Sequence, residues 1–174
     1  MKILFLGDSI TEGFNTARLL NDFAITNKGV SGDNTSDTIN RLNDNSFIQD
    51  SYDFVFLCIG TNDIAQGKND DEIIINIQEI ITRIKEIQPE GKLVLTSIFP
   101  TLSNEPRPNE RIVELNEKIY VLAKNNGLNY FNLYPNFINE NGELKTEFSL
   151  DGLHLRKVAY KMWAKLFTEF ISQI

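Results

Sequence analysis

The stretch that decides the fold is residues 3–13, ILFLGDSITEG, in which four apolar residues are followed directly by a polar, glycine-marked turn. A short apolar run that ends at a glycine and an aspartate is typical of a buried strand in a parallel sheet. Ser9 and Glu12 follow with the three-residue spacing of a capping box, in which a serine begins a helix. The stretch therefore predicts a strand, a tight turn at Gly7 and a helix capped by Ser9.

The rest of the chain alternates between strand-like and helix-like patterns. Further apolar runs predict strands at residues 23–26, 54–59, 93–97 and 130–131. Apolar residues at one-turn spacing predict helices over 73–87, 112–122 and 159–171, and the apolar stripe of the last helix is expected to pack on the core. This alternation predicts an α/β fold, with about five parallel strands covered by helices on both faces. No linker divides residues 1–174, so we expect a single domain.

Composition and charge exclude several classes of function. The 174 residues include 17 Lys and Arg against 24 Asp and Glu, a net charge of −7, which disfavours binding to nucleic acid or to anionic lipid. One histidine and one cysteine cannot form a zinc cage or an internal disulfide, and we expect Cys58 to be a buried core thiol. No signal peptide or membrane span is visible, so we expect a cytoplasmic protein. The glycine-rich motifs that bind nucleotide phosphates are absent as well, and we expect no bound cofactor.

Polar, glycine-marked segments follow three of the predicted strands, at residues 7–13, 29–33 and 60–63, and a fourth covers residues 151–154 before the last helix. In open parallel sheets, ligands bind outside the carboxyl ends of the strands. The residues that could perform chemistry are therefore sought in these four segments.

Ser9, His154 and Asp151 are candidates for nucleophilic catalysis. A serine hydroxyl needs a base to take its proton, and His154 is the single imidazole of the chain. Asp151 stands three residues earlier, a spacing that lets its carboxylate accept a hydrogen bond from one ring nitrogen while the other faces outward. The structural alternatives are a helix cap for Ser9 and a helix N-cap or turn for Asp151.

Acyl transfer also needs hydrogen-bond donors for the oxyanion of the tetrahedral intermediate. The backbone amides of Ser9 and Gly32 are candidates, since glycine permits close approach of a ligand to the backbone. The side-chain amide of Asn62 offers a third donor. Read singly, Gly32 would be a turn glycine and Asn62 an Asx-turn residue.

Taken in chain order, the four segments read GDSITEG, NKGVSGD, GTND and DGLH. This order resembles the SGNH hydrolases, also called GDSL-type esterases and lipases, over nearly the whole chain. The resemblance implies a three-layer α/β/α sandwich of flavodoxin-like topology. It also implies a catalytic Ser9, Asp151 and His154, an oxyanion hole of Ser9, Gly32 and Asn62, and no metal or cofactor. The wording of the middle segments is similar to bacterial members that resemble platelet-activating-factor acetylhydrolases and carbohydrate O-acetylesterases.

The sequence therefore predicts a serine esterase for small acyl esters, acetyl esters first, on a sugar or a small alcohol. Lysophospholipid and thioester substrates stay open as alternatives within the same family. A second hypothesis is a metal-assisted hydrolase that uses Asp8, Asp33, Asp63 and Asp151. A third is a non-catalytic binding module of flavodoxin-like shape in which Ser9 only caps a helix.

Overall fold

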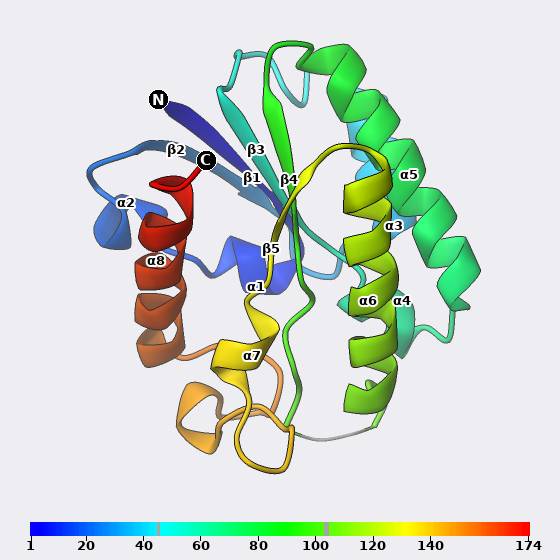
Figure 1. The fold of residues 1–174 in the computed structure, drawn as a ribbon, viewed down its shortest axis with the longest axis vertical. Coiled ribbons are helices and arrows are strands. Elements are labelled where there is room, and N and C mark those ends of the chain that lie inside the picture. The colour runs from blue at the N-terminus through cyan, green and yellow to red at the C-terminus, as the bar shows by residue number, and fades with distance from the viewer. Residues whose placement is uncertain (45, 103–104) are drawn as a thin grey trace.

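A five-stranded, fully parallel sheet forms the centre of the protein. The computed structural model describes residues 1–44, 46–102 and 105–174. The strands are β1 (Lys2–Gly7), β2 (Ala24–Gly29), β3 (Phe54–Cys58), β4 (Lys92–Thr96) and β5 (Asn129–Phe131), in the order β2-β1-β3-β4-β5 (Figure 1). The predicted α/β fold is confirmed, and the strand order is the flavodoxin-like one.

Helices cover both faces of the sheet. The helices are α1 (Ser9–Glu12), α2 (Thr16–Leu19), α3 (Thr35–Leu42), α4 (Thr61–Ala65), α5 (Asp70–Ile87), α6 (Asn109–Asn125), α7 (Tyr134–Phe137) and α8 (Lys157–Ile171), with a 3₁₀ turn at Thr146–Phe148. Figure 1 shows α8 on one side of the sheet and α3, α5 and α6 on the other. The three-layer arrangement implied by the resemblance is therefore present.

Each central strand buries side chains on both faces, which explains its continuous apolar sequence. In β1, Ile3 and Phe5 belong to the apolar cluster that includes α8. Leu4 and Leu6 belong to the cluster formed with α3, α5 and α6. Because successive side chains of a strand point to opposite faces, a single run of four apolar residues supplies both halves of the core.

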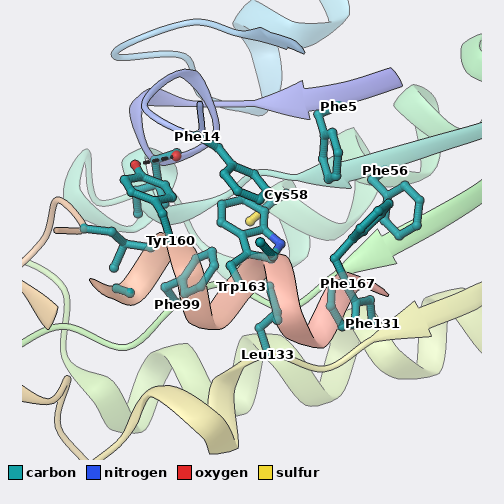
Figure 2. Packing of buried hydrophobic residues seen from close by; sticks show 14 of the residues in the cluster. Phe5, Phe14, Phe56, Cys58, Phe99, Phe131, Leu133, Tyr160, Trp163 and Phe167 are labelled. Atoms are coloured by element: carbon teal, nitrogen blue, oxygen red, sulfur yellow. Dashed lines mark hydrogen bonds between the residues drawn. The ribbon is translucent and has the colours of Figure 1, made fainter. Parts of the chain in front are cut away.

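The α8 face of the core is dominated by aromatic rings (Figure 2). Trp163 stacks on Phe14 with ring centroids 4.4 Å apart. Phe167 is fully buried and lies 5.3 Å from the Phe5 ring and 5.1 Å from the Phe56 ring. The stripe on the last helix is thus core packing, as predicted, rather than a surface for a partner.

The structure differs from the sequence prediction at the edge of the sheet. The strand predicted at 23–26 is β2, which begins one residue later and continues three residues further, to Gly29. The prediction stopped short because this edge strand is only partly buried and carries polar residues. Helix α3 was not predicted; Asn34 caps it, in a capping box with Asp37. Among the described residues, no helix is both long and apolar enough to cross a membrane.

The strand order fixes where a ligand can bind. From β1 the chain moves outward to β2 and then returns to the other side of β1 as β3. In open parallel sheets, ligands bind outside the carboxyl ends of the strands, at the point where the strand order reverses. Here that point lies between β1 and β3. Ser9 follows β1 and Asn62 follows β3, so both candidate residues lie at this edge of the sheet.

Replacing Phe167 by alanine should lower the free energy of unfolding by about 3–5 kcal/mol, because the change leaves a cavity between α8 and the sheet. Urea unfolding followed by the fluorescence of Trp163 measures the change. Val158→Ala, on the same helix but 45% exposed, is the matched control and should change stability by less than about 0.5 kcal/mol. Equal losses in the two variants would contradict this description of the core.

Candidate active site

Ser9 stands at the first position of α1, directly beyond the end of β1. A side chain at Gly7 would collide with Thr11 and with the carbonyl oxygen of Cys58, so glycine is needed for the helix to begin this close to the sheet. Asp8 is the N-cap of α1, and its Oδ1 accepts a hydrogen bond from the Ile10 amide at 2.9 Å. The prediction that Ser9 caps the helix is wrong, because the residue before it performs that task.

Three of the predicted residues form a hydrogen-bonded chain. Ser9 Oγ lies 3.0 Å from His154 Nε2, although the two residues are 145 positions apart in the sequence. His154 Nδ1 lies 2.7 Å from Asp151 Oδ2. An ionised carboxylate only accepts hydrogen bonds, so Nδ1 carries the proton and Nε2 is left to accept the serine proton.

The Asp151 carboxylate is held in place by its own turn. Oδ1 accepts hydrogen bonds from the backbone amides of Leu153, at 3.0 Å, and of His154, at 2.8 Å. The hydrogen bond from the His154 ring lowers the pKa of Asp151 most, and these amides lower it further. Asp151 is therefore a turn residue, as in the structural alternative, and is also bonded to the imidazole. The side chains of Asp151 and His154 are about half exposed, so the site is open to solvent.

Gly32 lies in the loop between β2 and α3. Its φ of +84° is a conformation that side chains disfavour, and a Cβ at this position would meet no atom within 4 Å. Its amide has no acceptor among the described residues, and the same holds for the amide of Ser9. Both groups are thus available to an anion.

The loop of Gly32 is anchored by the residue that follows it. The carboxylate of Asp33 pairs with the Arg41 guanidinium at 2.6 and 2.9 Å. The Asp33 carbonyl oxygen accepts a hydrogen bond from Asn62 Nδ2 at 2.8 Å. The structure therefore joins the second and third polar segments through Asn62, which uses one of its two amide hydrogens and keeps the other.

A buried network below Asn62 fixes α3 against α4. The Asp63 carboxylate is fully buried and accepts hydrogen bonds from the Thr35 amide, at 2.9 Å, and from the Thr35 hydroxyl, at 2.6 Å. Lys68 Nζ lies 3.0 Å from the same carboxylate and neutralises it. The two loops that carry Gly32 and Asn62 are therefore tied together by hydrogen bonds and an ion pair.

Sequence reasoning missed Arg107, which belongs to the site. Its Nε donates to the Thr61 carbonyl oxygen and its Nη2 to Asn62 Oδ1, both at 3.1 Å. Arg107 precedes α6 in a loop and is 45 residues from Asn62, so no spacing rule connects the two. An arginine in a polar loop gives no sequence signal that could have singled it out.

Asp8 is a buried carboxylate beside the serine. Burial raises its pKa from 3.8 to about 6, although the amides of Ile10 and Thr11 and the charges of Arg107 and His154 act in the opposite direction. An ionised carboxylate here is costly because it is removed from water.

The four aspartates of the metal hypothesis are engaged separately. Asp33 pairs with Arg41 and Asp63 with Lys68, while Asp151 is bonded to His154. Nowhere in the described part of the chain do three His, Cys, Asp or Glu side chains gather as a set that could hold a metal ion. Geometry thus gives no support to a metal-assisted hydrolase.

Cys58 lies at the end of β3 and is buried, as predicted for a core thiol. Burial, together with the charge of Asp8, raises the pKa of this thiol well above its ordinary value. A thiol in this state is a poor nucleophile, because the thiolate is the reactive form.

Comparison with known proteins identifies the family and the fold of the chain. The model of the GDSL-like lipase/acylhydrolase family matches residues 5–162. The chain is 24% identical over 165 residues to human platelet-activating factor acetylhydrolase IB subunit alpha1. The aligned region covers 91% of this chain and 70% of the human protein. A protein from Streptococcus pneumonia, provisionally described as a platelet activating factor, superposes with a TM-score of 0.90 at 29% identity, over 97% of this chain and 82% of its own. A lipase/acylhydrolase from Enterococcus faecalis gives a TM-score of 0.78 at 28% identity, over 98% and 94% of the two chains.

Replacing Asp8 by asparagine should change how stability depends on pH. The raised pKa means that the folded protein holds a proton between about pH 4 and 6 that the unfolded chain releases, so this group lowers stability as the pH rises through that window. Asparagine keeps an acceptor oxygen for the Ile10 amide but carries no charge. Relative to the wild type, the Asp8→Asn variant should therefore gain on the order of 2–3 kcal/mol between pH 4 and 7.

Urea unfolding at several pH values measures this difference, with Asp22→Asn as a control at an exposed turn. The control should follow the wild-type curve at every pH. Parallel curves for the wild type and the Asp8→Asn variant would show that Asp8 is ionised at no cost.

Proposed function

The chain belongs to the GDSL-like lipase/acylhydrolase (SGNH) family and is an ester-hydrolysing acylhydrolase; from this premise we propose that Ser9 is its nucleophile. In this proposal His154 is the general base, and Asp151 orients the imidazole and stabilises its cation. The backbone amides of Ser9 and Gly32 and the side-chain amide of Asn62 form the oxyanion hole. The substrate is a short acyl ester, with acetyl as the preferred acyl group.

The observation that carries the proposal is the pair of short contacts on the two nitrogens of one imidazole. Ser9 Oγ lies 3.0 Å from Nε2, and Asp151 Oδ2 lies 2.7 Å from Nδ1. Both distances are those of hydrogen bonds, so no rearrangement is needed before the serine can be deprotonated. A serine that only caps a helix has no need of an oriented imidazole.

Acylation follows from these contacts. Ser9 Oγ attacks the ester carbonyl carbon while its proton passes to His154 Nε2, and the C=O electron pair moves onto the oxygen. The three donors stabilise this oxyanion. The intermediate then collapses: the bond to the alcohol oxygen breaks, the imidazolium returns the proton to that oxygen, and an acyl group remains on Ser9.

Deacylation repeats the same steps with water. His154 takes a proton from a water molecule that attacks the acyl-enzyme, and the Ser9 oxygen leaves with that proton. The half-exposed side chains of His154 and Asp151 support this step, because bulk water reaches the base directly.

Two features support a small substrate with a polar alcohol. A cavity of about 240 Å³ adjoins Asp151, and its lining includes Thr101, Arg107 and the backbone of Gly152. The lining also includes Glu105, Pro106 and Leu153, so charged and hydroxyl groups stand beside apolar ones. These charged and hydroxyl groups suit a sugar or another hydroxylated leaving group better than a lipid tail. The human relative is named an acetylhydrolase, which supports acetyl as the acyl group.

Replacing Ser9 or His154 by alanine should lower kcat on p-nitrophenyl acetate by at least about 10⁴-fold, because each change removes one of the two groups that transfer the proton. Asn62→Ala should lower kcat by about 10²–10³-fold through the loss of one oxyanion donor. Ser172→Ala, an exposed serine after α8, is the control and should keep full activity.

A fluorophosphonate should label the wild-type protein stoichiometrically at Ser9 and leave the Ser9→Ala variant unlabelled. Near wild-type turnover by either folded alanine variant would overturn the assignment of the nucleophile and base. A wild-type protein that is not labelled would favour the non-catalytic binding module instead.

The acyl preference is tested by a series of p-nitrophenyl esters from acetate to decanoate, followed by acetylated sugars. We expect kcat/KM to be highest for acetate and to fall with chain length, because the site is open and its adjoining cavity, of about 240 Å³, is small and lined partly by charged side chains. A maximum at long chains would instead favour a lysophospholipase, and faster cleavage of acetyl thioesters than of oxygen esters would favour a thioesterase.

A further inference from the structure

Arg107 stands two residues before α6 and reaches across to the start of α4. Its guanidinium holds two neighbouring acceptors at once, the Thr61 carbonyl oxygen and the Asn62 side-chain oxygen, each at 3.1 Å. We propose that Arg107 is a positioning residue of the oxyanion hole, which fixes and polarises the Asn62 amide so that its Nδ2 donates to the transition state. This inference rests on the proposed function, since it needs Asn62 to be an oxyanion donor.

The orientation of an asparagine side chain is set by its partners, because its oxygen and nitrogen ends have nearly the same shape. On one side of Asn62 is the Asp33 carbonyl oxygen, which requires a donor and lies 2.8 Å from Nδ2. On the other side is Arg107, which can only donate and therefore requires the oxygen. With both partners present, the reversed orientation would lose two hydrogen bonds. Without Arg107, only the contact with Asp33 opposes it.

The arginine is itself held rigidly. The Thr101 hydroxyl donates to the Arg107 carbonyl oxygen at 2.9 Å. Asn109 forms a two-way clamp on the backbone of Thr101, since its Oδ1 accepts from the Thr101 amide and its Nδ2 donates to the Thr101 carbonyl. The planar fork of the guanidinium matches the two acceptors on Thr61 and Asn62, which the single ammonium group of a lysine cannot reproduce.

The charge of Arg107 adds to the effect. A cationic donor on Asn62 Oδ1 draws electron density toward the oxygen and makes the Nδ2 hydrogens more positive, as in other chains of hydrogen bonds. Arg107 also attracts the charge of Asp8, the buried carboxylate next to the nucleophile. It thereby offsets a negative charge that would oppose an oxyanion on the substrate. Both effects grow as negative charge develops, so they act on the transition state more than on the bound ester.

The test is a double-mutant cycle on p-nitrophenyl acetate, comparing wild type, Asn62→Ala, Arg107→Met and the double variant. Arg107→Met should lower kcat by about 10–100-fold, with KM changed by less than about threefold. In the Asn62→Ala background, the same change should lower kcat by no more than about threefold, because Arg107 then has no amide to hold and only the weaker effect of its charge on Asp8 is left. Arg107→Lys should recover part of the lost kcat, since it restores the charge but not the fork.

Arg111→Met is the matched control. Arg111 donates to Asp70 and to backbone carbonyls near α4, but it does not contact Asn62, so its loss should leave kcat within about threefold of wild type. Should Arg107→Met fail to fold, Arg107→Lys replaces it in the cycle, and its partial loss of kcat should again vanish in the Asn62→Ala background.

The outcomes separate this inference from the proposed function. If the wild type is active and the losses from Asn62→Ala and Arg107→Met multiply, the positioning role alone is overturned. A loss that appears only in KM would also overturn it, because it would indicate a direct contact between Arg107 and the substrate. A wild-type protein that neither hydrolyses esters nor is labelled at Ser9 would overturn the proposed function and this inference together.

Discussion

The hydrogen bond between the Ser9 hydroxyl and His154 joins the first polar loop of the chain to the last, and its geometry is set by core packing. Helix α8, which follows His154, is fastened to the segment around α1 by two contacts. The Tyr160 hydroxyl donates to the Ile10 carbonyl oxygen at 2.8 Å, and Trp163 stacks on Phe14. Since rigid aromatic packing leaves little freedom to α8, the distance from the Ser9 hydroxyl to the His154 ring is fixed before any substrate binds.

Charged groups of both signs lie around this bond. Two carboxylates, Asp8 and Asp151, lie beside the site that we propose for the oxyanion. Asp151 is offset by the imidazole, which becomes a cation as the serine is deprotonated. Burial raises the pKa of Asp8 to about 6, and the guanidinium of Arg107 offsets its charge when it is ionised. The balance allows a chain with a net charge of −7 to stabilise an anion locally.

The sequence predicts the helices and strands whose apolar residues follow the spacing of a buried strand or a buried helix face. The central strands and α5, α6 and α8 were predicted because apolar periodicity reports directly on burial. The edge strand β2 was predicted only in its first half and α3 was missed, since both are partly exposed and rich in polar residues. Five site residues could be recognised in the sequence because each stands in one of the four glycine-marked segments, the last of which carries the lone histidine. They are Ser9, Gly32, Asn62, Asp151 and His154. Arg107 contacts Asn62 only in the folded chain, so no sequence pattern connects the two. Residue patterns locate a helix start only to within one or two residues, and the N-cap of α1 is Asp8, one residue before the predicted Ser9.

In the proposed site, three donors from separate loops meet where the Ser9 oxygen attacks an ester. A crystal structure of the protein with a methylphosphonyl group on Ser9 shows whether they do, because the phosphonyl oxygen takes the position of the oxyanion. We expect this oxygen to lie about 2.7–3.1 Å from the amide nitrogens of Ser9 and Gly32 and from Asn62 Nδ2. A phosphonyl oxygen directed into solvent, away from Gly32 and Asn62, would contradict it.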